Sequence, residues 1–242
     1  MTFSVVARCA RTGQLGVAVA TAVPAVGSMC PFVRARVGAV STQAWINPCL
    51  ALDALKCMEQ GASATEALAR VMDADEGRQL RQVGLVDAQG RSAAWSGMAC
   101  TDWFGHIVEP GFAVQGNMLV SAATIQAMAA AMRASESLEL AERLLLAMEA
   151  GEAAGGDKRG RQSASLEVCD TEAYPLVDLR VDEHSHPIVE LRRVWNIAKL
   201  QLLPFVQSMP RKGGPGAPAP DEVVRMLGIP PPYRPGGGGS AP

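Results

Sequence analysis

Two apolar segments near the start of the chain have the residue pattern of β-strands. Residues 3–8 and 15–20 are apolar or alternate between apolar and polar, and the turn residues 11–13 separate them. A period of two lets a strand bury one face, and a short loop containing glycine joins two such strands as a hairpin. Residues 33–44 have the pattern of a further strand. The chain is therefore predicted to begin with a sheet.

Two helices are predicted next from their capping signals. The first covers residues 47–58, because its proline suits a first helical turn and Gly61 suits the exit. Ser63 and Glu66 form the capping box of a second helix that ends near residue 72. Both helices are expected to lie outside the sheet that precedes them.

After these helices the chain alternates again between strands and helices. Further strands are predicted at residues 82–87, 91–97, 112–119, 163–168 and 176–182. Further helices are predicted at residues 121–134, 138–150 and 187–203. Strands and helices that come in separate groups are typical of antiparallel sheets with helices outside, so the expected fold class is α+β. One arrangement with this order has four layers: helices, sheet, sheet, helices.

The composition is that of a globular chain with enough apolar residues for a core. The 242 residues are 48% apolar and 19% charged, with a formal net charge of −2. Because there is no basic block, we expect neither nucleic acid nor an anionic membrane as a partner. No apolar run approaches the roughly 18–20 residues of a membrane span. The start of the chain also lacks the charged and apolar regions of a secretory signal.

Six cysteines are scattered along the chain without Cys-x-x-Cys spacing. Zinc sites and disulfide frameworks usually show paired spacing, and reduced thiols are typical of the cytoplasm. We therefore expect a cytoplasmic protein with no metal and no other cofactor.

The end of the chain differs in composition from the rest. Residues 209–242 contain nine prolines and eight glycines, which do not favour a packed core. Residues 220–228 have the pattern of one short helix. We therefore predict one domain at residues 1–208 and a Pro/Gly-rich tail at residues 209–242.

Thr2 directly follows Met1 and begins the first predicted strand. Bacteria normally remove a methionine before a small residue, and removal would leave Thr2 with a free α-amine beside its own hydroxyl. The hydroxyl can then act as a nucleophile and the amine as its general base. An α-amine has a pKa of roughly 7.7–8.0, so it is partly neutral at physiological pH. The plain alternative is a strand end with no catalytic role.

Short motifs follow Thr2 along most of the chain. They are Met-Thr-Phe-Ser-x-Val-Ala-Arg at residues 1–8, Gly16–Ala20, Gly27, Thr42-Gln43, Asn47-Pro48, Gln82–Asp87, Cys100–His106, Gln115-Gly116-Asn117, Gly155–Ala164 and Asp178–His184. Together they resemble an uncharacterised bacterial family, a domain of unknown function in the N-terminal-nucleophile (Ntn) hydrolase superfamily, over residues 2–203. The resemblance implies the αββα sandwich of proteasome subunits and amidohydrolases, with Thr2 as the nucleophile after loss of Met1.

The resemblance also implies roles for polar residues elsewhere in the chain. Proteasome-like subunits place their oxyanion N–H groups at a strand end before a helix, which here corresponds to Thr42 and Gln43. The positions that support the α-amine correspond to Asn117, Asp157, Gln162 and Ser163. The negative charge of Asp157 would raise the pKa of that amine.

Arg34 departs from the pattern of the family that the chain resembles. Proteasome-like sites carry a lysine at the start of the third strand and a carboxylate after the second, where this chain has Arg34 and Thr21. Arginine stays protonated, so it can lower the pKa of a hydroxyl but cannot act as a base. Arg8 at the end of the first strand and His106 in a loop are further candidates to line the site.

These observations predict an amidohydrolase that uses Thr2 to cleave the C–N bond of a small amide or ureido-type substrate. By analogy with other Ntn folds we expect a homo-oligomer. Two alternatives remain open: a non-catalytic binding or assembly module on the same fold, and a metal-dependent hydrolase built on the cluster at residues 182–186. Cys100 as a nucleophile would need a base and a lowered pKa that the sequence does not show.

Overall fold

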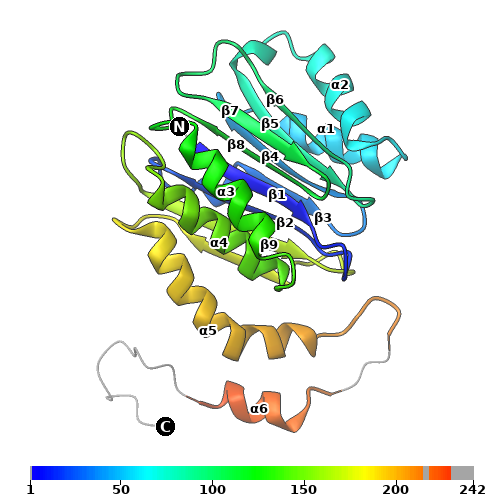
Figure 1. Ribbon diagram of the computed structural model, residues 1–242. Helices are drawn as coiled ribbons and strands as arrows, with labels where there is room; N and C mark the ends of the chain where they lie inside the picture. The colour runs from blue at the N-terminus through cyan, green and yellow to red at the C-terminus, as the bar shows by residue number, and fades with distance from the viewer. Residues whose placement is uncertain (1, 215–217, 230–242) are drawn as a thin grey trace. The chain divides into compact units, whose positions relative to one another are not determined.

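The structure, a computed structural model, describes residues 2–214 and 218–229. This part of the chain has an α+β fold with two antiparallel sheets and six α-helices (Figure 1). Contacts divide the chain into two compact units, Met1–Val194 and Trp195–Pro242. Both sheets belong to the first unit.

The strands are β1 (Thr2–Arg8), β2 (Leu15–Thr21), β3 (Pro31–Arg34), β4 (Gly38–Ala44), β5 (Arg81–Asp87), β6 (Ser92–Ser96), β7 (Gly105–Glu109), β8 (Phe112–Asn117), β9 (Ser163–Cys169) and β10 (Val177–Val181). The α-helices are α1 (Pro48–Glu59), α2 (Ala64–Ala74), α3 (Ala123–Ala134), α4 (Leu140–Ala153), α5 (Pro187–Gln207) and α6 (Asp221–Leu227). Two 3-10 helices are η1 (Val26–Ser28) and η2 (Arg78–Leu80).

β1 lies in the interior of the six-stranded sheet, whose order is β10-β9-β2-β1-β8-β7. The second sheet has the order β3-β4-β5-β6. Thr2, the first residue of β1, is opposite Thr21 at the end of β2 and opposite Asn117 at the end of β8. The start of the chain is thus held between two neighbouring strands.

Each sheet is covered by its own pair of helices. α3 and α4 pack on each other and contact the six-stranded sheet, through β8 and β7 for α3 and β2, β1 and β9 for α4. α1 and α2 contact strands of the four-stranded sheet. The two sheets contact one another, chiefly through β1, β2 and β8 against β4 and β5.

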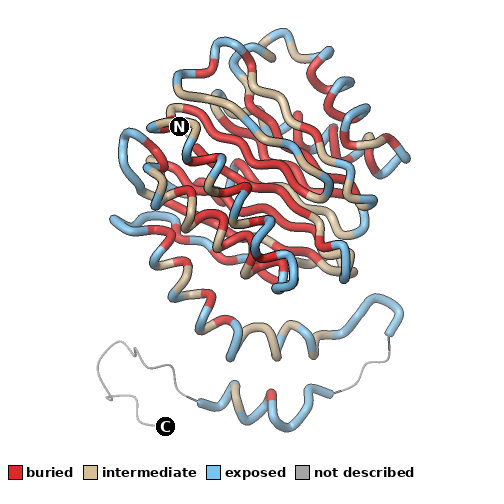
Figure 2. Tube along the Cα trace, viewed as in Figure 1, coloured by how far each residue is buried: buried red, intermediate tan, exposed pale blue. Residues whose placement is uncertain are grey.

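Apolar side chains fill the contacts between each sheet and its helices, and Figure 2 shows buried residues following the strands. Between the four-stranded sheet and its helices lies a cluster that includes Val83, Leu85, Leu55 and Leu68. α4 buries Leu144, Leu145 and Met148 completely. Burying a leucine side chain contributes roughly 1.5–3 kcal/mol, so these contacts supply much of the folding free energy.

The local predictions from the sequence are confirmed where capping and turn signals were specific. The β1–β2 hairpin forms in full register. Ser63 and Glu66 make both hydrogen bonds of the capping box at the start of α2. The Asn47 side chain accepts a hydrogen bond from the backbone N–H of Cys49, as a cap of α1 should.

Three predictions about individual strands and helices are wrong. The segment predicted as one strand over residues 33–44 is two strands, because Arg36 adopts a left-handed φ of 64° and the chain turns there. β7 forms over residues that the sequence pattern left as a loop. The last long helix continues to Gln207 rather than ending near residue 203.

The second unit holds the end of α5 and helix α6. The Lys199 ammonium lies 5.5 Å from the ring centre of Trp195, within cation–π range. The predicted boundary at residue 208 stays a prediction. Within the described residues, none of the helices combines the length and apolar character needed to cross a bilayer.

Candidate active site

Thr2 is a buried residue on the face of β1 that points toward the second sheet. It is 5% exposed, and its Oγ1 donates a hydrogen bond to Thr21 Oγ1 at 3.2 Å. Side chains alternate along a strand, so Thr2, Ser4 and Val6 share this face. Ser4 Oγ confirms the direction, because it donates to the side chain of Gln43 on β4 at 2.7 Å.

The layer between the two sheets has two chemically different parts. At the Arg8 end of β1 it is apolar, with Val6, Leu15, Val17, Ala39, Val86 and Ala113 packed together. At the Thr2 end it is polar, and we call the buried side chains there the polar half: Thr2, Ser4, Thr21, Gln43, Gln82, Gln115 and Asn117. Buried polar groups are costly unless hydrogen-bonded, and hydrogen bonds join most of this set, although Gln115 Oε1 has no partner among the described residues.

Gln43 links Thr2 to the second sheet. Its Nε2 donates to the backbone carbonyl of Thr2 at 3.2 Å and to Gln82 Oε1 at 2.7 Å. Its Oε1 accepts the hydrogen bond from Ser4 Oγ. The position of Thr2 therefore depends on the orientation of one amide side chain.

Gln82 on β5 is the centre of the network. Its Oε1 accepts from Gln43 Nε2 and from Asn117 Nδ2, at 2.7 and 3.0 Å. Its Nε2 donates to Ser96 Oγ at 2.7 Å and to the carbonyls of Gly116 and Gly105 at 2.9 and 3.2 Å. The sequence analysis placed Gln82 in the Gln82–Asp87 motif but gave it no role at the site. The available signal was a glutamine inside an otherwise apolar strand.

His106 joins the same network indirectly. Its Nδ1 lies 2.9 Å from Ser96 Oγ, which in turn accepts from Gln82. Burial lowers the pKa of His106, so the neutral imidazole is favoured. The side chains of Ser96, Gln82 and Gln43 connect this ring to the Thr2 carbonyl, and His106 is not a direct neighbour of the hydroxyl.

Asp157, Gln162 and Ser163 gather at the end of β2, next to Thr21. Asp157 Oδ2 accepts the backbone N–H of Ala22 at 3.1 Å. The backbone N–H of Gln162 donates to the Thr21 carbonyl at 2.8 Å, and Ser163 Oγ donates to the Val23 carbonyl at 2.6 Å. All three bonds go to the backbone, so this group holds the strand that faces Thr2.

A small cavity opens beside this group. Phe3, Thr21, Asp157 and Arg161 are among its lining residues, and its volume is about 30 Å³. A cavity of that size has room for roughly one water molecule.

Thr42, Arg8 and Arg34 lie away from Thr2. The Thr42 backbone N–H donates to the Cys30 carbonyl at 3.1 Å, and its Oγ1 donates to the Asn47 carbonyl at 3.3 Å. Arg8 is at the opposite end of β1, roughly 20 Å along the strand. Arg34 is at the far end of β3 and pairs with Glu59 at 2.7 Å. The structure does not bring these three side chains to the Thr2 hydroxyl.

The other candidates have structural contacts of their own. His184 Nδ1 accepts the backbone N–H of His186, whose ring lies 3.1 Å from the Arg161 guanidinium. Within residues 2–214 and 218–229, no three His, Cys, Asp or Glu side chains are grouped to hold a metal ion. Burial raises the pKa of Cys100, which disfavours a reactive thiolate.

The fold and site define an α+β protein whose interior strand begins with a buried threonine tied to an amide network. The chain belongs to a family of unknown function, DUF1028, whose model matches residues 2–191. No curated protein matches the chain.

One solved structure is similar over most of the chain. It is a DUF1028 protein from Silicibacter pomeroyi, 30% identical, with a TM-score of 0.80 over 87% of this chain and 95% of that chain. Anbu (ancestral beta-subunit) from Yersinia bercovieri is 13% identical, with a TM-score of 0.37 over 87% of this chain and 99% of that chain. The Anbu likeness is too weak to carry an argument about function.

Proposed function

We propose that the chain is an Ntn amidohydrolase with the four-layer αββα sandwich, and that Thr2 is its nucleophile once Met1 is removed. The observation that carries the proposal is the place of Thr2. It begins an interior strand, its hydroxyl is buried against Thr21, and Gln43 holds its carbonyl. A nucleophile must be held in one geometry to react efficiently, and these contacts supply that restraint.

The reaction follows from one residue that carries both nucleophile and base. The free α-amine of Thr2 takes the proton of its own Oγ1, which attacks the carbonyl carbon of an amide or ureido group. The C–N bond breaks as the ammonium returns a proton to the leaving nitrogen. Water, activated by the same amine, then hydrolyses the ester on Oγ1 and releases the acid.

Asn117 is the side chain that we assign to the oxyanion. Thr42 cannot take this role through its backbone, because its N–H already donates to Cys30. Asn117 is the cross-strand neighbour of Thr2, and its Nδ2 donates to Gln82 Oε1. A primary amide has two hydrogens on nitrogen, so a second one can be donated to a developing negative charge.

Asp157 is a positioning residue in this proposal. Its carboxylate holds the N–H of Ala22 and the N–H of Arg159, at 3.1 and 2.8 Å. It thereby fixes the end of β2, which carries Thr21. The proposed substrate is a small molecule, and the proposed protein is a cytoplasmic homo-oligomer.

The test is turnover together with the mass of the N-terminal peptide. The purified chain is incubated with a panel of small amides, lactams and ureides, and an acyl adduct is sought on the peptide that begins with Thr2. Thr2→Ala should lower turnover by at least about a thousandfold, as loss of a nucleophile does. Thr65→Ala, on the exposed face of α2, is the matched control and should leave turnover unchanged. Full activity of Thr2→Ala would overturn the mechanism.

A non-catalytic binding module is the second candidate. One observation favours it: the contact between Thr2 Oγ1 and Thr21 Oγ1 has the form of an ordinary cross-strand threonine pair. Intact mass separates the two functions. Met1 retained on every molecule favours the binding module, because no free amine then exists beside the hydroxyl.

A further inference from the structure

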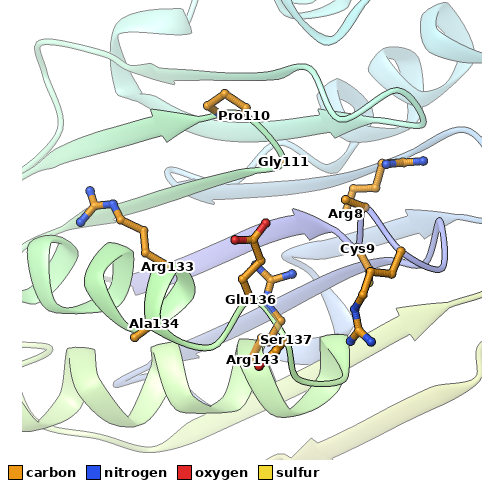
Figure 3. A pocket seen from close by; sticks show the side chains of 11 residues that line it. Arg8, Cys9, Pro110, Gly111, Arg133, Ala134, Glu136, Ser137 and Arg143 are labelled. Atoms are coloured by element: carbon orange, nitrogen blue, oxygen red, sulfur yellow. The ribbon is translucent and has the colours of Figure 1, made fainter.

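A second cavity lies at the other end of β1 from Thr2. Its volume is about 480 Å³, which is in the range of small-molecule sites. Figure 3 shows the side chains around it, which come from the end of β1, the β1–β2 turn, the β7–β8 turn, the end of α3, the α3–α4 connection and α4. The lining residues are Arg8, Cys9, Ala10, Arg11, Pro110, Gly111, Arg133, Ala134, Glu136, Ser137 and Arg143.

The charge around this cavity is unbalanced. Arg133 is neutralised by Glu109, which it contacts through two nitrogens. Within the described part of the chain, the remaining three arginines, Arg8, Arg11 and Arg143, form no ion pair with a carboxylate. Glu136 is the carboxylate that lines the same cavity. Three such arginines against one carboxylate leave an excess of two positive charges.

Arg143 is the strongest of these observations. It is 7% exposed and lines the cavity, and its Nη2 donates to the Met132 carbonyl at 3.3 Å. Its Nε is fully buried and meets no acceptor, and the same is true of Arg8 Nε. Burial lowers the pKa of Arg143, so the site carries the cost of an unpaired cation.

The thiol of Cys9 lines the same cavity. Burial raises the pKa of a thiol, but hydrogen bonds with Thr12 and Arg11 and the charge of Arg11 outweigh it here. The pKa of Cys9 is lowered as a result. An anion is therefore favoured in this cavity by groups on two elements, the β1–β2 turn and α4.

We propose that this cavity binds a small organic anion that carries two negative charges on carboxylate or phosphate groups. A guanidinium group donates two parallel hydrogen bonds to a pair of oxygens, and both a carboxylate and a phosphate present such a pair. The charge of the ligand matches the excess around the cavity. The site is separate from Thr2 and does not depend on the function proposed for it.

The experiment is calorimetric titration of the full chain with sodium succinate and, separately, with inorganic phosphate. Sodium chloride keeps the ionic strength constant during the titration. Any heat that comes only from screening of the arginine charges by salt is therefore the same for every ligand. We expect saturable binding of at least one dianion: succinate alone indicates a carboxylate ligand, and phosphate alone a phosphate ligand. Absence of binding by both dianions overturns the proposal.

Variants assign the binding to the cavity. Arg143→Met should weaken binding by roughly tenfold or more, because it removes a charge-assisted hydrogen bond. Arg11→Gln changes an exposed side chain, so it keeps the test valid if Arg143→Met does not fold. Arg70→Gln, on an exposed part of α2, is the matched control. Equal weakening by Arg70→Gln would show that only net charge matters and would sink the assignment.

Discussion

Replacement of Gln82 by leucine tests whether the polar half is a true network. The side chain is fully buried and has five hydrogen-bond partners, two at Oε1 and three at Nε2, where three acceptors share two hydrogens. Leucine fills a similar volume but removes all five. The change isolates hydrogen bonding from packing more cleanly than alanine would.

The structure shows which partners keep an alternative. In the variant, Gln43 Nε2 still has its hydrogen bond to the Thr2 carbonyl, and Ser96 Oγ still has its hydrogen bond with the His106 ring. Asn117 Nδ2 and the carbonyls of Gly116 and Gly105 lose their bonds to Gln82. A buried polar group without a partner costs about 1–3 kcal/mol, and burial of the leucine recovers part of the loss. We expect the free energy of unfolding to fall by about 3 kcal/mol.

Urea unfolding measures this change through the midpoint, provided that the m-value stays constant. The matched control is Gln126→Leu, an exposed position on α3, which should change stability by less than about 0.5 kcal/mol. A loss below about 1 kcal/mol for Gln82→Leu would refute the reasoning, because it would mean that solvent or local rearrangement satisfies these groups.

Two further predictions concern other buried positions of the first unit. Gly84→Ala would place a Cβ 2.2 Å from Gln115 Oε1, so we expect a loss of about 1–3 kcal/mol in urea unfolding; wild-type stability would contradict the tight packing. Burial and the Asp178 carboxylate raise the pKa of Glu167 to about 7 from 4.5. The folded state therefore keeps a proton that the unfolded state releases, and stability is full below about pH 4.5 and falls by up to about 3 kcal/mol as the pH rises past 7. Glu167→Gln should remove this fall, and an unchanged pH profile of unfolding would show that Glu167 is not its source.

Local sequence signals were sufficient for much of the fold. The β1–β2 hairpin and the capping box at Ser63 depend on neighbours within a few residues, and both are present in the structure. The split between β3 and β4 was not predictable in this way. It depends on a left-handed residue, Arg36, which is neither glycine nor asparagine.

The residues predicted for the site also differ in whether the structure brings them to Thr2. Thr2, Asn117 and Gln43 were expected near one another, and the structure brings them into one connected network. Arg8 does not line the site around Thr2, because the two residues are at opposite ends of a seven-residue strand. The backbone N–H of Thr42, expected to hold the oxyanion, donates to the Cys30 carbonyl, whereas Gln43 contacts Thr2 through its side chain.

The sequence places Gln82 in a motif but does not show its role, because that role depends on which strands of two sheets lie opposite each other. Its partners are 14 to 39 residues away along the chain. A glutamine in a strand is equally compatible with an exposed edge. Only the packing of the two sheets against each other brings its partners on both sheets within hydrogen-bonding distance.

The division of the inter-sheet layer has a consequence for how the two sheets choose their alignment. Attraction between apolar surfaces is not directional, so two sheets with apolar faces could shift by two residues relative to each other at a small cost in free energy. Here such a shift would place the amides of Gln43 and Gln82 against Val6 and its neighbours, with their hydrogen bonds unmade. The polar half thus fixes the alignment of the two sheets: it contributes less attraction than an apolar layer would, but it allows one alignment, the one that keeps the Gln43 side chain on the Thr2 carbonyl.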